Sequence, residues 1–215
     1  MLDAGTRARP QTVWSLDAWA AISPAAAFRY IATCPSSQGT WLALRRPLFT
    51  ATVLACGVSM LSAGVVTPRI ALSAFIYWAY VPLTEMMMVA AVTWRMKTRP
   101  PMATVIDRFF MGHAPSTLLM LALVGILTSL PFDRWWTMLT GPLLWAFALV
   151  VLWSAYVDFC FFRYALRIRP ARAAAVLFAQ RLLTWTTVFV VFAVVAPSVR
   201  VIAWELTETF LEVME

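Results

Sequence analysis

A single acidic residue lies deep inside a long apolar segment of the chain. Glu85 is the only charged residue from Ile70 to Trp94. As a helix rising about 1.5 Å per residue, this segment is long enough to cross the hydrocarbon core of a bilayer. An ionised carboxylate in hydrocarbon is costly unless it is paired, protonated or hydrated. The sequence therefore predicts polar partners around Glu85.

A basic residue lies at a matching depth in a second apolar segment. Counted from the inner ends of their segments at about 1.5 Å per residue, Glu85 is about 13 Å deep and Arg181 about 12 Å deep. The matched depths predict an ion pair between Glu85 and Arg181 if the two segments touch. Asp158 and Gln180 belong to the same inner half and extend the predicted polar network.

This predicted network has three interpretations. The groups can satisfy one another and fix the register of the helices, which is a structural role. They can instead form a proton or substrate site in a cavity opened by a kink at Pro82. In the third interpretation they pair with a partner subunit.

Motifs for familiar catalytic chemistry are missing from the sequence. It contains no GxSxG, HExxH, Walker loop or GxGxxG pattern. His113 is the only histidine, and a lone histidine is a poor basis for a haem or metal site. Cys34, Cys56 and Cys160 lack metal-type spacing. We expect a protein that is not an enzyme and that has no cofactor and no metal site.

The composition is that of a membrane protein. Hydrophobic residues make up 62% of the chain and charged residues 13%, and the mean hydropathy is +0.78. An ordinary soluble domain has roughly a quarter charged residues. The net charge of +7 is interpreted as a sign of topology rather than of nucleic-acid binding, because basic loops set membrane orientation.

The apolar pattern predicts an all-α, polytopic membrane bundle with five transmembrane helices. Interfacial amphipathic helices are expected at the amino terminus, between the second and third spans, and at the carboxyl terminus. A loosely ordered amino-terminal arm is the alternative. The chain divides into an arm, a transmembrane domain and an outer acidic helix, at 1–40, 41–196 and 197–215. The spans are predicted at about 47–66, 70–94, 116–130, 137–157 and 173–196.

Local signals predict where several helices begin and end. Ser23 precedes Pro24, a residue suited to the first position of a helix. Gly112 can end a helix and Pro115 can begin the next. The turn Thr67-Pro68-Arg69 is so short that the first two spans should be antiparallel neighbours. A break is also expected at Pro35-Ser36-Ser37-Gln38-Gly39 and a turn at 131–136.

The basic residues predict the orientation of these spans. With the amino terminus in the cytoplasm, the outer segments hold only Arg69, Arg134 and Arg200 of the 17 basic residues. All others lie in inner segments or near the inner end of the fifth span. This asymmetry predicts five crossings, with the acidic carboxyl terminus outside. We expect an integral membrane protein, of the bacterial inner membrane.

Two groups of charged residues are candidate contact surfaces. The basic residues beside the inner ends of the spans are candidates for lipid headgroups or partner proteins: Arg45, Arg46, Arg95, Lys97, Arg99, Arg163, Arg167, Arg169 and Arg172. The outer helix carries an acidic face that either meets a basic protein surface or is simply solvated: Glu205, Glu208, Glu212 and Glu215.

The arm carries the motif SPAAAFRYI from Ser23 to Ile31. Together with five spans and a short outer tail, this motif resembles the Yip family of five-span membrane proteins. The chain lacks the long acidic, aromatic cytoplasmic region of the trafficking members. The resemblance implies a non-enzymatic membrane scaffold or adaptor, and no functional residue is transferred from it.

Two functions follow from these patterns. The first is a non-catalytic integral membrane subunit or scaffold that packs against partner membrane proteins and lipids, helped by small residues in the first span: Ala51, Ala55, Gly57, Ser59, Ser62, Ala63 and Gly64. The alternative is a small transporter or a proton or ion pathway that uses Glu85, Arg181 and Asp158.

Overall fold

A computed structural model describes residues 13–34, 40–63, 65–96, 101–129, 141–191 and 193, and all regular structure in those ranges is helical. The all-α prediction is therefore confirmed there. Several predicted features lie outside the described residues: the break at 35–39, Lys97 and Arg99, the turn at 131–136, and the acidic helix at 197–215 with Glu205, Glu208, Glu212 and Glu215.

The amino-terminal arm contains two short helices, α1 (Val13–Ile22) and α2 (Pro24–Ile31). Pro24 is the first residue of α2, as predicted, because its fixed φ suits the helix and its missing N–H is not needed there. Ser23 occupies the N-cap position, but its side chain makes no capping hydrogen bond. Both helices pack against the rest of the chain, so the arm is ordered from Val13 to Cys34.

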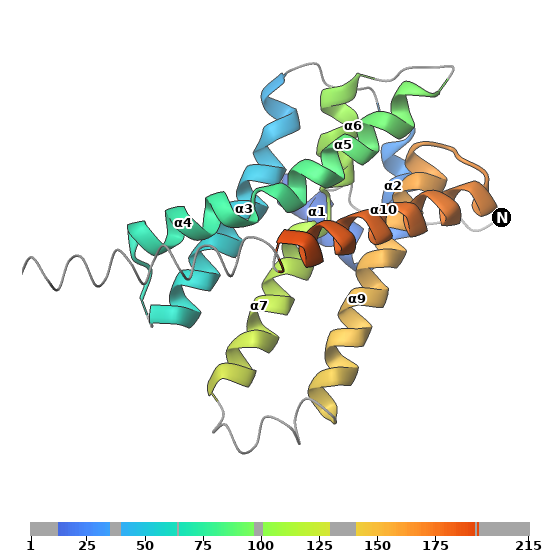
Figure 1. Ribbon diagram of the computed structural model, residues 1–215. Coiled ribbons are helices and arrows are strands. Elements are labelled where there is room, and N and C mark those ends of the chain that lie inside the picture. The colour runs from blue at the N-terminus through green and yellow to red at the C-terminus, as the bar shows by residue number, and fades with distance from the viewer. Residues whose placement is uncertain are drawn as a thin grey trace, which may run out of the picture.

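The first two predicted spans form an antiparallel pair, α3 (Thr40–Ala63) and α4 (Pro68–Trp78) (Figure 1). Ser59 holds the turn between them, because its hydroxyl accepts the N–H of Thr67 at 3.0 Å and donates to the carbonyl of Val65 at 3.1 Å. This arrangement confirms the prediction made from the short turn. The helix α3 begins at Thr40, earlier than the predicted start near residue 47, so Arg45 and Arg46 lie inside it.

Four of the predicted small residues, Ala51, Ala55, Gly57 and Ser59, serve contacts inside the chain, and Gly64 lies outside the described residues. Ala51, Ala55 and Ser59 are buried, and a Cβ on Gly57 would meet the side chain of Leu121 in α7 (His113–Ser129) at 2.5 Å. A larger residue at this position would require the Leu121 side chain to move. This face of α3 is therefore occupied within the chain.

The second predicted span is interrupted after α4 and continues as α5 (Tyr80–Trp94). The interruption lies at Ala79. Pro82 has no N–H to donate to the carbonyl of Trp78, four residues earlier, and its ring crowds that carbonyl. The predicted kink is therefore present, three residues before Pro82.

The described chain continues after α5 with a short helix and three longer ones. The short helix α6 (Met102–Phe109) lies between α5 and α7, and Gly112, with a φ of +88°, turns the chain before α7. After α9 (Pro142–Cys160) the chain continues through a π-helical turn, η1 (Phe161–Ala165), and Pro170 begins α10 (Pro170–Val190). The helix α7 begins two residues before the predicted start at Pro115.

Three helical segments among the described residues are long and apolar enough to cross a membrane. They are Pro68–Trp94, with 27 residues, Pro142–Ala165, with 24, and Pro170–Val190, with 21. The apolar helix Pro115–Ile126 is shorter. Crossings by α3 and α7, which the five-span arrangement requires, stay a prediction.

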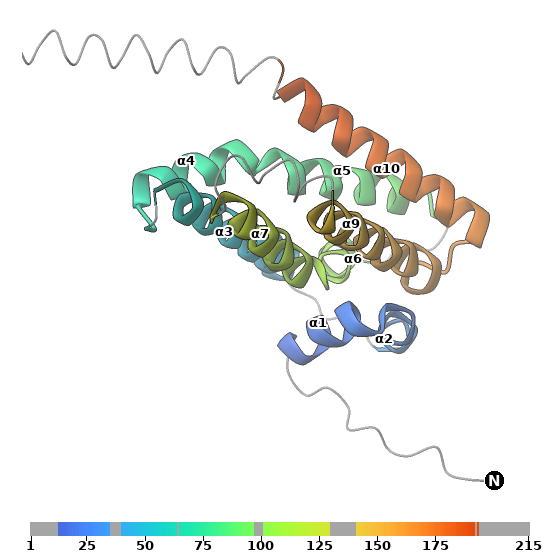
Figure 2. The same cartoon turned by 90° about the horizontal axis from the view of Figure 1, so that it is seen from below.

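The helices form layers with the aromatic core at one end. Figure 2 shows α3, α7 and α9 between the arm helices α1 and α2 on one side and α4, α5 and α10 on the other. Phe28, Phe109, Phe161 and Phe162 are fully buried where α2, α6 and η1 meet. The long helices instead expose large apolar side chains, such as Trp145 at 70%. This distribution suits helices surrounded by lipid.

Candidate functional site

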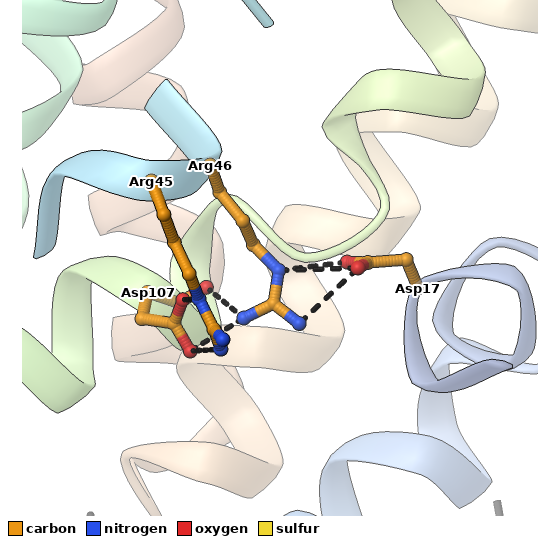
Figure 3. A network of polar contacts seen from close by, with 4 residues as sticks. All are labelled: Asp17, Arg45, Arg46 and Asp107. Carbon is orange, nitrogen blue, oxygen red and sulfur yellow. Dashed lines mark hydrogen bonds and ion pairs between the residues drawn. The ribbon is translucent and has the colours of Figure 1, made fainter. Parts of the chain in front are cut away.

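One buried ion-pair network joins the arm to the first long helix. We call Asp17, Arg45, Arg46 and Asp107 the anchor cluster (Figure 3). Arg45 binds Asp107 through two hydrogen bonds of 2.7 and 2.8 Å. Arg46 lies 2.9 Å from Asp17 and also pairs with Asp107. The four side chains thus connect α1, α3 and α6.

The charges of the anchor cluster balance, with two guanidiniums facing two carboxylates. Only 8% of the Arg46 and Asp17 side chains is exposed. Burial raises the pKa of Asp17 above its ordinary value of 3.8, and the Arg46 guanidinium offsets part of that rise. Because removal of one partner from a buried ion pair leaves an uncompensated charge, this network holds the arm in place.

This network bears on the predicted role of two arginines. We expected Arg45 and Arg46 to face lipid headgroups or partner proteins, whereas the structure gives both guanidiniums carboxylate partners within the chain. A buried guanidinium such as that of Arg46 is not presented to a headgroup. The pairing was not visible in sequence, because Asp17 lies 29 residues away.

A second polar network lies between four helices. We call Glu85 of α5, His113 of α7, Asp158 of α9 and Arg181 of α10 the four-helix cluster. Arg181 Nη2 lies 2.6 Å from Asp158 Oδ2. His113 Nε2 lies 3.6 Å from Asp158 Oδ1 and 3.8 Å from Glu85 Oε2, which is ion-pair distance but too long for a hydrogen bond.

The structure changes the pairing expected from sequence. It brings Glu85, Asp158 and Arg181 into one cluster, but Arg181 pairs with Asp158 and the nearest cationic group to Glu85 is His113. His113 was not predicted as a member. The sequence offered no signal for this position, because the contact requires the start of α7 to pack beside the end of α9.

Several buried polar atoms around the four-helix cluster have no hydrogen-bond partner among the described residues. They are both amide atoms of Gln180, Nδ1 of His113, Nε of Arg181 and the hydroxyl of Thr184. Gln180 is only 1% exposed. Buried polar groups are nearly always hydrogen-bonded in folded proteins. The cluster therefore has donors and acceptors to spare for water, a proton or a small polar ligand.

The charges of the four-helix cluster do not balance in the same way. Two carboxylates face one guanidinium and one imidazole. With both carboxylates ionised and the imidazole neutral, the net charge is −1, which is costly in a dry interior. One added proton brings the cluster to neutrality. The chemistry that this arrangement allows is the holding and release of one proton.

The remaining basic candidates lie outside both clusters. Arg163 donates to the carbonyl of Ile168 at 3.0 Å, while Arg95, Arg167, Arg169 and Arg172 are exposed. These four form the basic end of α5 and α10. Their predicted contacts with headgroups or partners stay a prediction.

Comparison of the chain with protein-family models, curated proteins and solved structures finds no match. The resemblance to the Yip family therefore stays a prediction. Among the described residues, no group of three or more His, Cys, Asp or Glu side chains is arranged to hold a metal ion.

Proposed function

We propose that the protein is a non-catalytic integral membrane subunit or scaffold that packs against lipids and partner membrane proteins. In this proposal it crosses the bacterial inner membrane five times, with the amino terminus in the cytoplasm and the carboxyl terminus outside. The partners are membrane lipids and other membrane protein subunits, not nucleic acid.

The observation that carries this proposal is how little of the long helices is buried within the chain. In the most apolar windows of Pro68–Trp94, Pro142–Ala165 and Pro170–Val190, the buried share is 12%, 28% and 17%. Phe178 and Phe189 of α10 are 71% and 73% exposed. Lipids and helices of other proteins are the apolar surfaces that can cover such faces.

Purification from the native membrane tests the proposal. The untagged protein is extracted in mild detergent, and the mass of the particle is measured. The proposal predicts a stable complex with other membrane proteins in fixed stoichiometry. A particle that contains only copies of this chain contradicts it.

A second function, a proton pathway, is favoured by the four-helix cluster. Glu85, His113 and Asp158 form a chain of ionisable groups between helices, and unpartnered polar atoms lie beside them. Ionisable groups of this kind inside a membrane commonly mark proton relays. In this candidate function the spare proton of the cluster is the one that moves.

Proton flux into liposomes tests this second candidate. The purified protein is reconstituted with a pH-sensitive dye inside the vesicles, and flux is measured per folded molecule. Glu85→Gln should abolish the flux, whereas Asp17→Asn, the same chemical change in the anchor cluster, should leave it unchanged. Equal flux in wild type and Glu85→Gln, or no flux in wild type, rejects the proton pathway.

A further inference from the structure

A groove between α5 and α10 opens where the basic residues gather. Its volume is about 420 Å³, within the range of about 300 to 1,000 Å³ for small-molecule sites. Apolar side chains form most of its lining, and the only charged residues on it are Arg95 and Arg172. The groove thus combines an apolar body with two guanidiniums.

The two helices place both arginines at the same end of the groove. Four residues from Met88 to Arg95 line it from one side, and four from Arg172 to Ala179 line it from the other. The helices run in opposite directions, so the end of α5 lies beside the start of α10 (Figure 2). The arginine is the last lining residue on α5 and the first on α10. Small residues, among them Ala91 and Ala175, leave the space between them open.

The described residues supply no anion for these two arginines. Within the described residues, neither has an ion-pair partner. No acidic residue occurs in the sequence from 86 to 106 or from 159 to 204. Within the part of the chain that the structure describes, the positive charge of this groove is therefore not balanced, which favours an anionic ligand.

We propose that this groove binds one anionic phospholipid. The phosphate lies between Arg95 and Arg172, and an acyl chain follows the apolar lining past Ala91 and Ala175. Basic pockets between membrane helices on the cytoplasmic side are a known mode of binding acidic headgroups. The inference rests on the proposed membrane embedding of α5 and α10, and it adds a defined lipid site to it.

Native mass spectrometry tests the site. The protein is reconstituted in nanodiscs that contain equal amounts of phosphatidylglycerol and phosphatidylcholine, then released, and the retained lipid is identified. We expect one phosphatidylglycerol per wild-type chain. At about 1 kcal/mol per basic residue, Arg95→Gln with Arg172→Gln should weaken its binding at least tenfold. The control, Arg69→Gln, removes a positive charge at the exposed start of α4, outside the groove lining, and should weaken binding less than threefold.

A second pair of variants tests the acyl chain without changing charge. Ala175→Trp fills the groove and should expel the lipid, whereas Ala174→Trp, one residue away and outside the lining, should not. Equal loss in the two tryptophan variants, or equal retention of the two lipids by wild type, overturns the site. A chain that does not enter nanodiscs contradicts the membrane embedding, whereas an inserted chain without phosphatidylglycerol contradicts the groove alone.

Discussion

The anchor cluster and the four-helix cluster both contain two buried carboxylates, but they differ in how those carboxylates are paired. Asp17 and Asp107 face two guanidiniums at hydrogen-bonding distance. Asp158 pairs with the one guanidinium, Glu85 and Asp158 share one imidazole, and the imidazole lies beyond hydrogen-bonding distance of both. In the first arrangement each carboxylate has a guanidinium partner, whereas in the second only the imidazole lies within ion-pair distance of Glu85.

This difference separates a structural role from a chemical one. A fully paired network fixes the position of helices and has no capacity left. A network with unpartnered atoms can exchange protons or water, at a cost in stability. The two clusters should therefore respond in opposite ways to loss of a polar group.

The largest effect is expected from Arg46→Met in the anchor cluster. It leaves Asp17 buried without its guanidinium, which costs about 3 to 5 kcal/mol of unfolding free energy. Denaturant unfolding in detergent micelles measures the loss. Arg169→Met, at an exposed arginine, is the control and should change stability by less than about 0.5 kcal/mol. If Arg46→Met also changes the unfolding free energy by less than about 0.5 kcal/mol, the anchor cluster does not hold the arm in place.

An opposite and smaller effect is expected from Gln180→Leu beside the four-helix cluster. The substitution removes a buried amide without partners, and burial of such a group costs about 1 to 3 kcal/mol. We expect unfolding free energy to stay equal or rise by about 1 kcal/mol. Ser154→Ala is the contrast, because Ser154 accepts a hydrogen bond from Arg181 at 3.1 Å and its loss should destabilise. Destabilisation by Gln180→Leu means that the amide has a partner, and the contrast between the clusters then fails.

The smallest effect is a pH dependence from Asp17. Burial raises the pKa of Asp17 in the folded state, so the folded chain binds this proton more tightly than the unfolded chain does. The contribution of Asp17 to stability is therefore largest below its ordinary pKa of 3.8 and declines as pH rises through the folded pKa. The stability of wild type minus that of Asp17→Asn should rise on acidification from pH about 7 to about 4. If this difference falls on acidification instead, the Arg46 guanidinium lowers the pKa of Asp17 more than burial raises it.

Sequence alone predicted the features that depend on neighbours in the chain. Pro24 at the start of α2, the turn at Thr67 and the left-handed Gly112 follow from local backbone preferences. The kink near Pro82 follows from a missing N–H. That Glu85, Asp158 and Arg181 belong to one polar network followed from their position in the inner halves of apolar segments.

The pairings between distant helices were beyond reach of the sequence. Arg46 resembled a positive flank of a span, and only the packing of α1 against the bundle brings Asp17 to it. His113 joins the four-helix cluster because the start of α7 packs beside the end of α9. The direction of a side chain between helices depends on their crossing, which residue periodicity does not specify.

Both proposed functions require lipid around the four-helix cluster, and labelling of single cysteines tests this most directly. With Cys34, Cys56 and Cys160 replaced by serine, Val66→Cys marks the turn between α3 and α4, and Arg167→Cys marks the turn before α10. In intact cells, an impermeant maleimide should label the cysteine at 66, and the cysteine at 167 only after permeabilisation. Labelling of both without permeabilisation, or of 167 alone, contradicts the membrane threading on which both proposed functions depend.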